Sequence, residues 1–190
     1  MKHRSLVLFL AVLLVPSLAL AGNFVQGDFG SLNAKADLEV SAKAALQNIL
    51  MSELGALGDE ELHVVRTTVG VDGRTHVRFH QTFNGLRVVG ADMYLHADAA
   101  GNITAVNGSF LRGNADVAFS PALDGQKALN LALGKAGISG DRLDRGAELV
   151  YVLDRDGKAH LAWQATVSYV NAEGPQVDRV FASAGNGKLI

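Results

Sequence analysis

The sequence predicts an α+β fold of two similar halves, each a helix packed on an antiparallel sheet, preceded by a cleaved signal peptide. Two observations favour this fold. Apolar residues recur at spacings of three and four in residues 37–54 and again in residues 124–136, as on one side of a helix. After each of these segments come runs in which apolar and polar residues alternate, which is typical of half-buried strands. A helix followed by a meander of strands therefore occurs twice.

The amino terminus has the composition of a secretory signal peptide. Residues 1–4 are basic, residues 6–20 form a continuous apolar run, and small residues lead up to Ala21. We expect cleavage between Ala21 and Gly22, and hence export to the periplasm or the extracellular space. A membrane anchor is the alternative, but the run is shorter than the ~20 residues that a spanning helix needs.

Composition excludes several classes of protein. The chain of 190 residues contains no cysteine, which excludes disulfides, a thiolate nucleophile and thiolate metal ligands. Its 17 basic and 19 acidic residues are nearly balanced, and no basic cluster could follow a phosphate backbone. Nucleic acid is therefore not expected as a partner, and neither is a membrane after the signal peptide is removed.

The first half begins with residues 22–36, which are small and polar and are predicted to be a flexible leader. The helix expected at residues 37–54 has two candidate caps, Asp37 and Ser41, and Gly55 is a plausible end. The apolar side of this helix is rich in alanine, which suits close packing on a sheet.

The strands of the first half follow at once. A weakly alternating run covers residues 61–69, and two stronger runs flank Asn84 and Gly85, a dipeptide that favours a tight hairpin. A further run follows the turn at residues 98–102. We assign residues 37–113 to a first domain.

The second half, residues 120–190, has the same order of elements. Its helix is expected at residues 124–136. Strands are predicted at residues 148–153, 160–170 and 177–182, with short glycine-containing turns between them. Trp163, the only tryptophan, falls on the apolar side of its strand and is expected in the core.

Two histidines have a spacing that could suggest a metal site. His76 and His80 are four residues apart, which suits chelation on a helix, but on a strand this spacing separates them by ~13 Å. Arg78 lies between them and would repel a cation. No histidine is followed by glutamate, so the zinc-protease motif His-Glu-x-x-His is absent. The interpretation that fits best is a solvated polar strand face.

Other catalytic patterns are also missing from the sequence. No serine stands in a Gly-x-Ser-x-Gly motif, and the glycines of the meander do not precede a helix, as a phosphate loop requires. Asp154 and Asp156 fit a solvated hairpin better than a calcium loop. Asp92, inside a strand beside Tyr94, is expected to make a structural hydrogen bond. We therefore predict no catalytic residue, no metal site and no cofactor.

One part of the first half resembles a known family. The matching segments are Thr-His-Val-Arg-Phe at 75–79, Gln-Thr-Phe-Asn-Gly at 81–85, Val-Val-Gly-Ala-Asp at 88–92 and the turn at 98–101. They resemble the fungalysin/thermolysin propeptide (FTP) region of thermolysin-family zinc metalloproteases. Residues 123–190 resemble more loosely the PepSY module that follows it, through Arg-Val-Phe at 179–181 and Gly-Lys-Leu at 187–189.

The resemblance implies a pro-region, not an enzyme. Such a region would act as inhibitor and folding chaperone of a thermolysin-like catalytic domain, attached in a longer gene or separate. By the same resemblance its carboxy-terminal segment would approach the catalytic cleft of the partner. The residues implied as partner-contacting are Phe181, Ser183, Lys188, Leu189 and Ile190.

Other functions fit the same sequence. The chain could be a secreted or cell-envelope binding module without a protease partner. Because no catalytic domain follows in the printed sequence, it could also be a truncated metalloprotease precursor.

Overall fold

A computed structural model describes residues 23–33, 37–58, 60–112, 117–143 and 146–190. The predicted signal peptide and its cleavage point between Ala21 and Gly22 lie outside this part of the chain. Neither of the helices in the described ranges is long and apolar enough to cross a membrane.

The described residues form two helices and nine strands. In chain order they are β1 (Asn23–Gln26), α1 (Leu38–Leu54), β2 (Glu61–Val69), β3 (Thr75–Phe83), β4 (Leu86–Ala97), β5 (Ile103–Gly108), α2 (Gly125–Ala136), β6 (Gly140–Arg142), β7 (Glu148–Leu153), β8 (Ala159–Asn171) and β9 (Gly174–Ser183). The α+β class predicted from the sequence is confirmed. β1 and β6 were not predicted, and β1 falls within the segment expected to be a leader.

All nine strands belong to one mixed sheet. The amino-terminal part pairs in the antiparallel order β2-β3-β4-β5-β1, and the carboxy-terminal part pairs β7, β6 and β9 with β8. The two parts meet through a short parallel pairing in which Val88 lies opposite Tyr151 and Val89 opposite Val152. The sequence predicts one separate antiparallel sheet in each half, and the parallel pairing that joins the two parts into one sheet was not predicted. The division into domains at 37–113 and 120–190 stays a prediction.

Local sequence sets the ends of both helices. The Asp37 carboxylate accepts hydrogen bonds from the backbone N–H groups of Glu39 and Val40, and Gly55 takes the left-handed conformation that ends α1. Of the two predicted caps, Asp37 is therefore confirmed. Ser41 lies inside the helix, and its hydroxyl accepts from the N–H of Asn33 at 2.7 Å. In α2, Asp124 accepts from the N–H of Lys127.

The predicted hairpin between β3 and β4 is confirmed. Asn84 and Gly85 both have positive φ, 49° and 74°, as the primed turn of a two-residue hairpin requires. A register shift follows between His80 and Gln81, so that β4 has extra residues opposite β3. At the start of β4, Val88 pairs with β3 on one edge and with β7 on the other, where β5 does not reach.

Three apolar clusters lie on the helix side of the sheet. One lies between α1 and β2–β5, including Leu46 and Phe79, and one lies between α2 and β8–β9, including Leu129 and Val167. The third joins the two parts around the fully buried Tyr151. Trp163 packs against both the second and the third cluster, whereas the cluster under α1 is separate from them.

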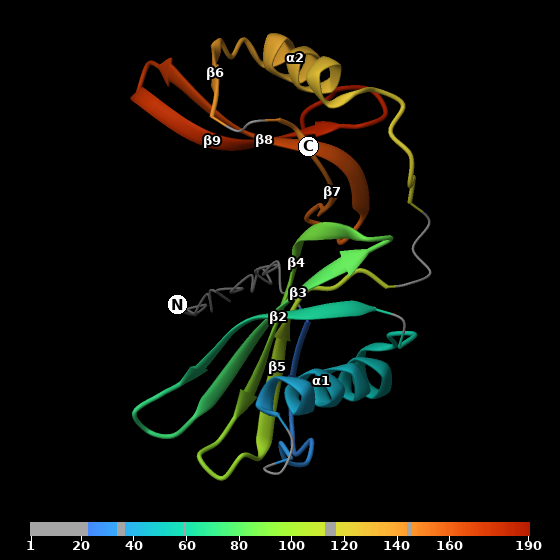
Figure 1. The fold of residues 1–190 in the computed structure, drawn as a ribbon, viewed down its shortest axis with the longest axis vertical. Helices are drawn as coiled ribbons and strands as arrows, with labels where there is room; N and C mark the ends of the chain where they lie inside the picture. Colours follow the sequence, from blue (N-terminus) through green and yellow to red (C-terminus); the bar gives the residue numbers. More distant parts are fainter. Residues whose placement is uncertain (1–22, 34–36, 59, 113–116, 144–145) are drawn as a thin grey trace, which may run out of the picture.

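Both helices cover the same face of the sheet. Val88 and Tyr151 belong to the junction cluster, Tyr151 lies opposite Leu161 in β8, and the same face of β8 continues to Ala165 and Val167 under α2. Figure 1 shows α2 outside the upper arm of the bent sheet and α1 outside the lower arm. On the opposite face, which we call the open face, the described residues place no helix.

Candidate docking face

The open face of the amino-terminal part is polar and rich in imidazole. The alternation of β2, β3 and β4 that directs apolar side chains to α1 directs the intervening side chains to the other face. Four of the six histidines meet there, one from β2, two from β3 and one from β4. We call these four the histidine face: His63, His76, His80 and His96.

The histidines form two cross-strand pairs. His63 lies opposite His80 with the rings stacked 5.1 Å apart, and His76 lies opposite His96 with their Nδ1 atoms 2.6 Å apart. Nε2 of His96 also bonds the side-chain oxygen of Asn107 at 2.5 Å. His76 and His80, which sequence spacing presents as a pair, thus have different partners.

These pairs do not complete a metal site. Among the residues that the structure describes, no group of three or more histidine, aspartate or glutamate side chains is arranged to hold a metal ion. Each pair offers two imidazoles at most, whereas a structural zinc site has four ligands.

Arg78 occupies the middle of the histidine face. Its guanidinium bonds the Asp92 carboxylate at 3.1 Å and lies 5.8 Å from the centre of the Tyr94 ring. The carboxylate of Asp92, which sits oddly within a strand sequence, therefore has the structural partner that was expected. Both side chains are partly exposed, so the pair contributes little net stability.

The electrostatics of the face disfavour added charge on His80. Partial burial lowers the pKa of His80 below its usual value of 6.5, and the neighbouring His63 and Arg87 lower it further. Asp92 opposes this shift, and Arg78 adds to it. His80 therefore prefers to be neutral in the folded protein.

The open face becomes apolar where the two parts of the sheet meet. Val150 and Ala162 are fully buried, and Val89 and Phe181 pack against them. Phe181, one of the predicted contact residues, thus lies on the open face at the edge of this apolar strip.

The predicted contact residues at the carboxy terminus turn back on β9. The N–H of Ser183 donates to the carbonyl of Lys188 at 2.7 Å, and the N–H of Ile190 donates to the carbonyl of Phe181 at 3.1 Å. Ala182 and Leu189 form a bridge between these bonds. The five predicted residues are therefore brought together in one hairpin, and the side chains of Leu189 and Ile190 are 46% and 42% exposed.

The turn between β7 and β8 adds a polar group that sequence reasoning assigned only to a solvated hairpin. Nε2 of His160 lies 2.7 Å from the Asp154 carboxylate, which also accepts from the N–H groups of Asp156 and Lys158. These bonds, first that from His160, lower the pKa of Asp154. Asp154 and His160 are six residues apart on the two sides of a predicted turn, and this spacing could have predicted that they are paired.

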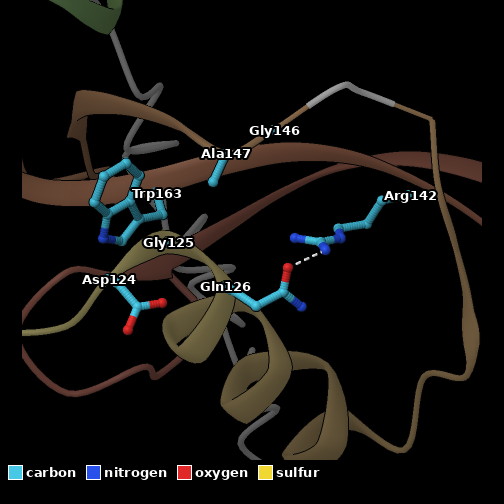
Figure 2. A pocket seen from close by; sticks show the side chains of 7 residues that line it. All are labelled: Asp124, Gly125, Gln126, Arg142, Gly146, Ala147 and Trp163. Carbon is cyan, nitrogen blue, oxygen red and sulfur yellow. Dashed lines mark hydrogen bonds between the residues drawn. The ribbon is translucent and has the colours of Figure 1, made fainter.

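A hollow of about 410 Å³ lies at the start of α2 (Figure 2). Its charged groups already have partners: Asp124 caps the helix, and the guanidinium of Arg142 bonds the side-chain oxygen of Gln126. The indole N–H of Trp163 donates to the carbonyl of Leu123 at 2.8 Å. These groups hold α2 on the sheet, and the arrangement contains no nucleophile and base in contact.

Comparison with known proteins gives one family and several relatives. Residues 60–110 match the family model described as the Fungalysin/Thermolysin Propeptide Motif. The chain is 31% identical over 178 residues to bacillolysin of Bacillus subtilis, which covers 87% of this chain and 34% of the relative. Bacillolysin of Bacillus amyloliquefaciens is 30% identical over 69% of the chain and 26% of its own length.

A fungal relative and one solved structure are also similar. Extracellular metalloproteinase 10 of Coccidioides posadasii is 30% identical over 75% of the chain and 27% of its own length. The chain thus spans about a third of the curated relatives, or less. The solved Bacillus megaterium YpeB C-terminal domain is 12% identical with a TM-score of 0.38, covering 87% of this chain and 68% of that one, which is too distant to define a shared fold.

Proposed function

Because residues 60–110 and the aligned bacillolysins confirm the resemblance to the propeptide region of thermolysin-family metalloproteases, we propose that this chain is an exported pro-region-like protein. It binds a thermolysin-like catalytic domain, inhibits it and assists its folding. The chain performs no catalysis itself.

The observation that carries the proposal is where the motif lies in the fold. Residues 60–110 include β2, β3, β4 and β5, the strands that build the histidine face and pack on α1. One face of this sheet holds the core, and no helix of the described segments lies on the other. A rigid sheet with a free polar face suits a protein whose task is to bind another protein.

The proposal extends to the carboxy-terminal part. Its helix and strands repeat the order of the first part, as expected for an FTP-like domain followed by a PepSY-like domain. The hairpin of Phe181, Ser183, Lys188, Leu189 and Ile190 is the proposed contact with the catalytic cleft. In its favour are the partly exposed apolar side chains of Leu189 and Ile190, in a segment whose backbone is bonded to that of Phe181.

Binding to the native catalytic domain would explain both roles. A ligand that binds the folded state and not the unfolded state stabilises the folded state by mass action, which assists folding. The same complex blocks substrate if the bound hairpin lies at the cleft. The catalytic domain is either joined to the chain in a longer precursor or separate from it.

The proposed location follows from the predicted signal peptide. Export would produce a mature chain that begins at Gly22, and amino-terminal sequencing of the exported product tests this. A secreted binding module without a protease partner is the alternative function, and it predicts the same processing but no effect on a protease.

The test uses mature bacillolysin from Bacillus subtilis as the probe. Peptide cleavage is followed with increasing amounts of the purified chain, and recovery of activity is followed after dilution of the unfolded enzyme from denaturant. We expect inhibition and a higher yield of refolded enzyme. If neither occurs at concentrations far above that of the enzyme, the proposal is wrong.

A matched pair of variants tests the hairpin. Deletion of residues 188–190 removes the segment that hydrogen-bonds to the end of β9, whereas Val177→Ser changes an exposed side chain at the far end of β9. We expect the deletion to weaken inhibition and the control to leave it unchanged. Equal inhibition by both would place the contact elsewhere.

A further inference from the structure

We propose that a hollow beside the histidine face binds a carboxylate side chain of a protein partner. The hollow has a volume of about 250 Å³ and is lined by Arg66, Thr68, His76, Arg78 and Tyr94. This inference rests on the proposed function, because it names the chemical group by which the partner docks on the open face.

The first argument is the pairing of two arginines. Arg66 lies directly opposite Arg78 in the ladder between β2 and β3. Like charges in opposite positions of an antiparallel pair destabilise a sheet unless an anion lies between them or near them. The side chain of Arg78 has the Asp92 carboxylate, but within the described ranges the side chain of Arg66 makes no hydrogen bond or ion pair.

The second argument is the chemistry of the lining. Guanidinium, hydroxyl, phenol and imidazole groups line the hollow, and no carboxylate does. Besides its bond to Asp92, Arg78 has a buried Nε with no partner among the described residues. A buried donor without an acceptor is costly, so the Asp92 bond does not satisfy all the donors of Arg78. Two guanidinium groups that share one carboxylate form charge-assisted bonds, the stronger kind.

The third argument selects a side chain as the occupant. Sites that recognise small molecules usually enclose most of the ligand in ~300–1,000 Å³, whereas this hollow is smaller and opens on a sheet surface. Arginine and tyrosine are also enriched at protein interfaces. An aspartate or glutamate presented by a protein surface fits such a place better than a free metabolite does.

Inhibition of mature bacillolysin by the full chain tests the site. Arg66→Gln removes the unpaired charge at an exposed position, so folding should be kept, and a melting curve checks this. Arg179→Gln removes an exposed arginine from β9 on the same open face, far from the hollow, as the matched control. We expect Arg66→Gln to weaken inhibition about ten-fold, as for the loss of one charge-assisted bond, and the control to change it less than two-fold.

The partner residue is then found with a double-mutant cycle. Surface carboxylates of bacillolysin are changed to amides one at a time and combined with Arg66→Gln. One of them should show coupling, whereas additive losses for all of them would overturn the inference.

An NMR titration follows the arginine Nε–H signals of the chain as sodium acetate is added. A titration with sodium chloride at equal ionic strength is the control. Acetate shifts confined to Arg66 and Arg78 would support the carboxylate site, and the absence of such shifts would overturn it. If acetate shifts these signals but Arg66→Gln inhibits bacillolysin as well as the wild-type chain does, the hollow binds free anions and not a partner. If the wild-type chain does not inhibit bacillolysin, the proposed function fails, and the titration alone decides whether the hollow is a carboxylate site.

Discussion

The side chain of Gln81 makes hydrogen bonds to both the carbonyl and the N–H of the Leu111 backbone. Its side-chain N–H donates to the carbonyl of Leu111 at 2.5 Å, and its side-chain oxygen accepts from the N–H of Leu111 at 2.7 Å. Gln81 is fully buried, and it follows the register shift of β3. Leu111 lies just after β5, so this contact holds the chain against the sheet where β5 ends.

Replacing this glutamine should strongly destabilise the fold. In Gln81→Ala two buried backbone groups lose their partners, and each such loss costs about 1–3 kcal/mol. We expect the free energy of unfolding to fall by about 2–4 kcal/mol in urea denaturation. Gln164→Ala is the control, since the side chain of Gln164 makes one long surface bond, 3.2 Å, to Glu148. A loss below 1 kcal/mol for Gln81→Ala would contradict this account.

The second prediction concerns mild acid. The pKa of His80 is below 6.5 in the folded protein, first because of burial and then because of His63 and Arg87. Below pH 6.5 the unfolded state therefore binds more protons than the folded state does. The contribution of His80 to stability is therefore complete above pH 6.5 and is lost as the pH falls through the lower folded value. We expect a smaller unfolding free energy at pH 5.5 than at pH 7.5.

His80→Asn should reduce this dependence, because asparagine does not titrate. The control is His160→Asn, which removes an imidazole from the other part of the sheet. Urea denaturation of all three chains between pH 5 and 8 provides the comparison. An unchanged slope in His80→Asn would mean that another group is responsible.

The third prediction concerns stronger acid. Three hydrogen bonds, first the one from His160, lower the pKa of Asp154. The carboxylate therefore stabilises the fold above its ordinary pKa of ~3.9, and the contribution is lost as the pH falls through the lower folded value. Asp154→Asn should be less stable than the wild type at pH 7, with the difference shrinking below pH 4. A difference that stays constant from pH 7 to pH 3 would exclude the carboxylate as its cause.

The features of this fold that the sequence predicts are those that depend on residues close together in the chain. The ends of α1 and the turn at Asn84 and Gly85 were predicted because they depend on neighbouring residues. The parallel pairing of Val88 with Tyr151 was not predicted, since 63 positions separate the two residues. The sequences of their two strands also look like those of antiparallel strands.

The same limit applies to the candidate site. Sequence spacing was enough to separate His76 from His80, but the pairings of His76 with His96 and of Arg66 with Arg78 depend on strand register. A bulge between Val64 and Arg66 brings Arg66 to the open face. An extra residue of this kind shifts the phase of the alternation, but the alternation of β2 is too weak to locate the shift from the sequence.

The last prediction tests whether the chain folds as one unit or as two domains. Tyr151 is fully buried in the cluster that joins the two parts, with its ring 5.5 Å from that of Phe83. Tyr151→Ala would leave a large cavity at the junction, at a cost of about 3–5 kcal/mol. Tyr151→Phe is the matched control, because it keeps the ring and loses only a 3.5 Å bond with Asn84. We expect Trp163 fluorescence and far-ultraviolet circular dichroism to give one coincident transition for the wild type and Tyr151→Phe, and separate transitions for Tyr151→Ala. Two transitions in the wild type would show that the shared core does not couple the parts, and would favour two domains that fold on their own.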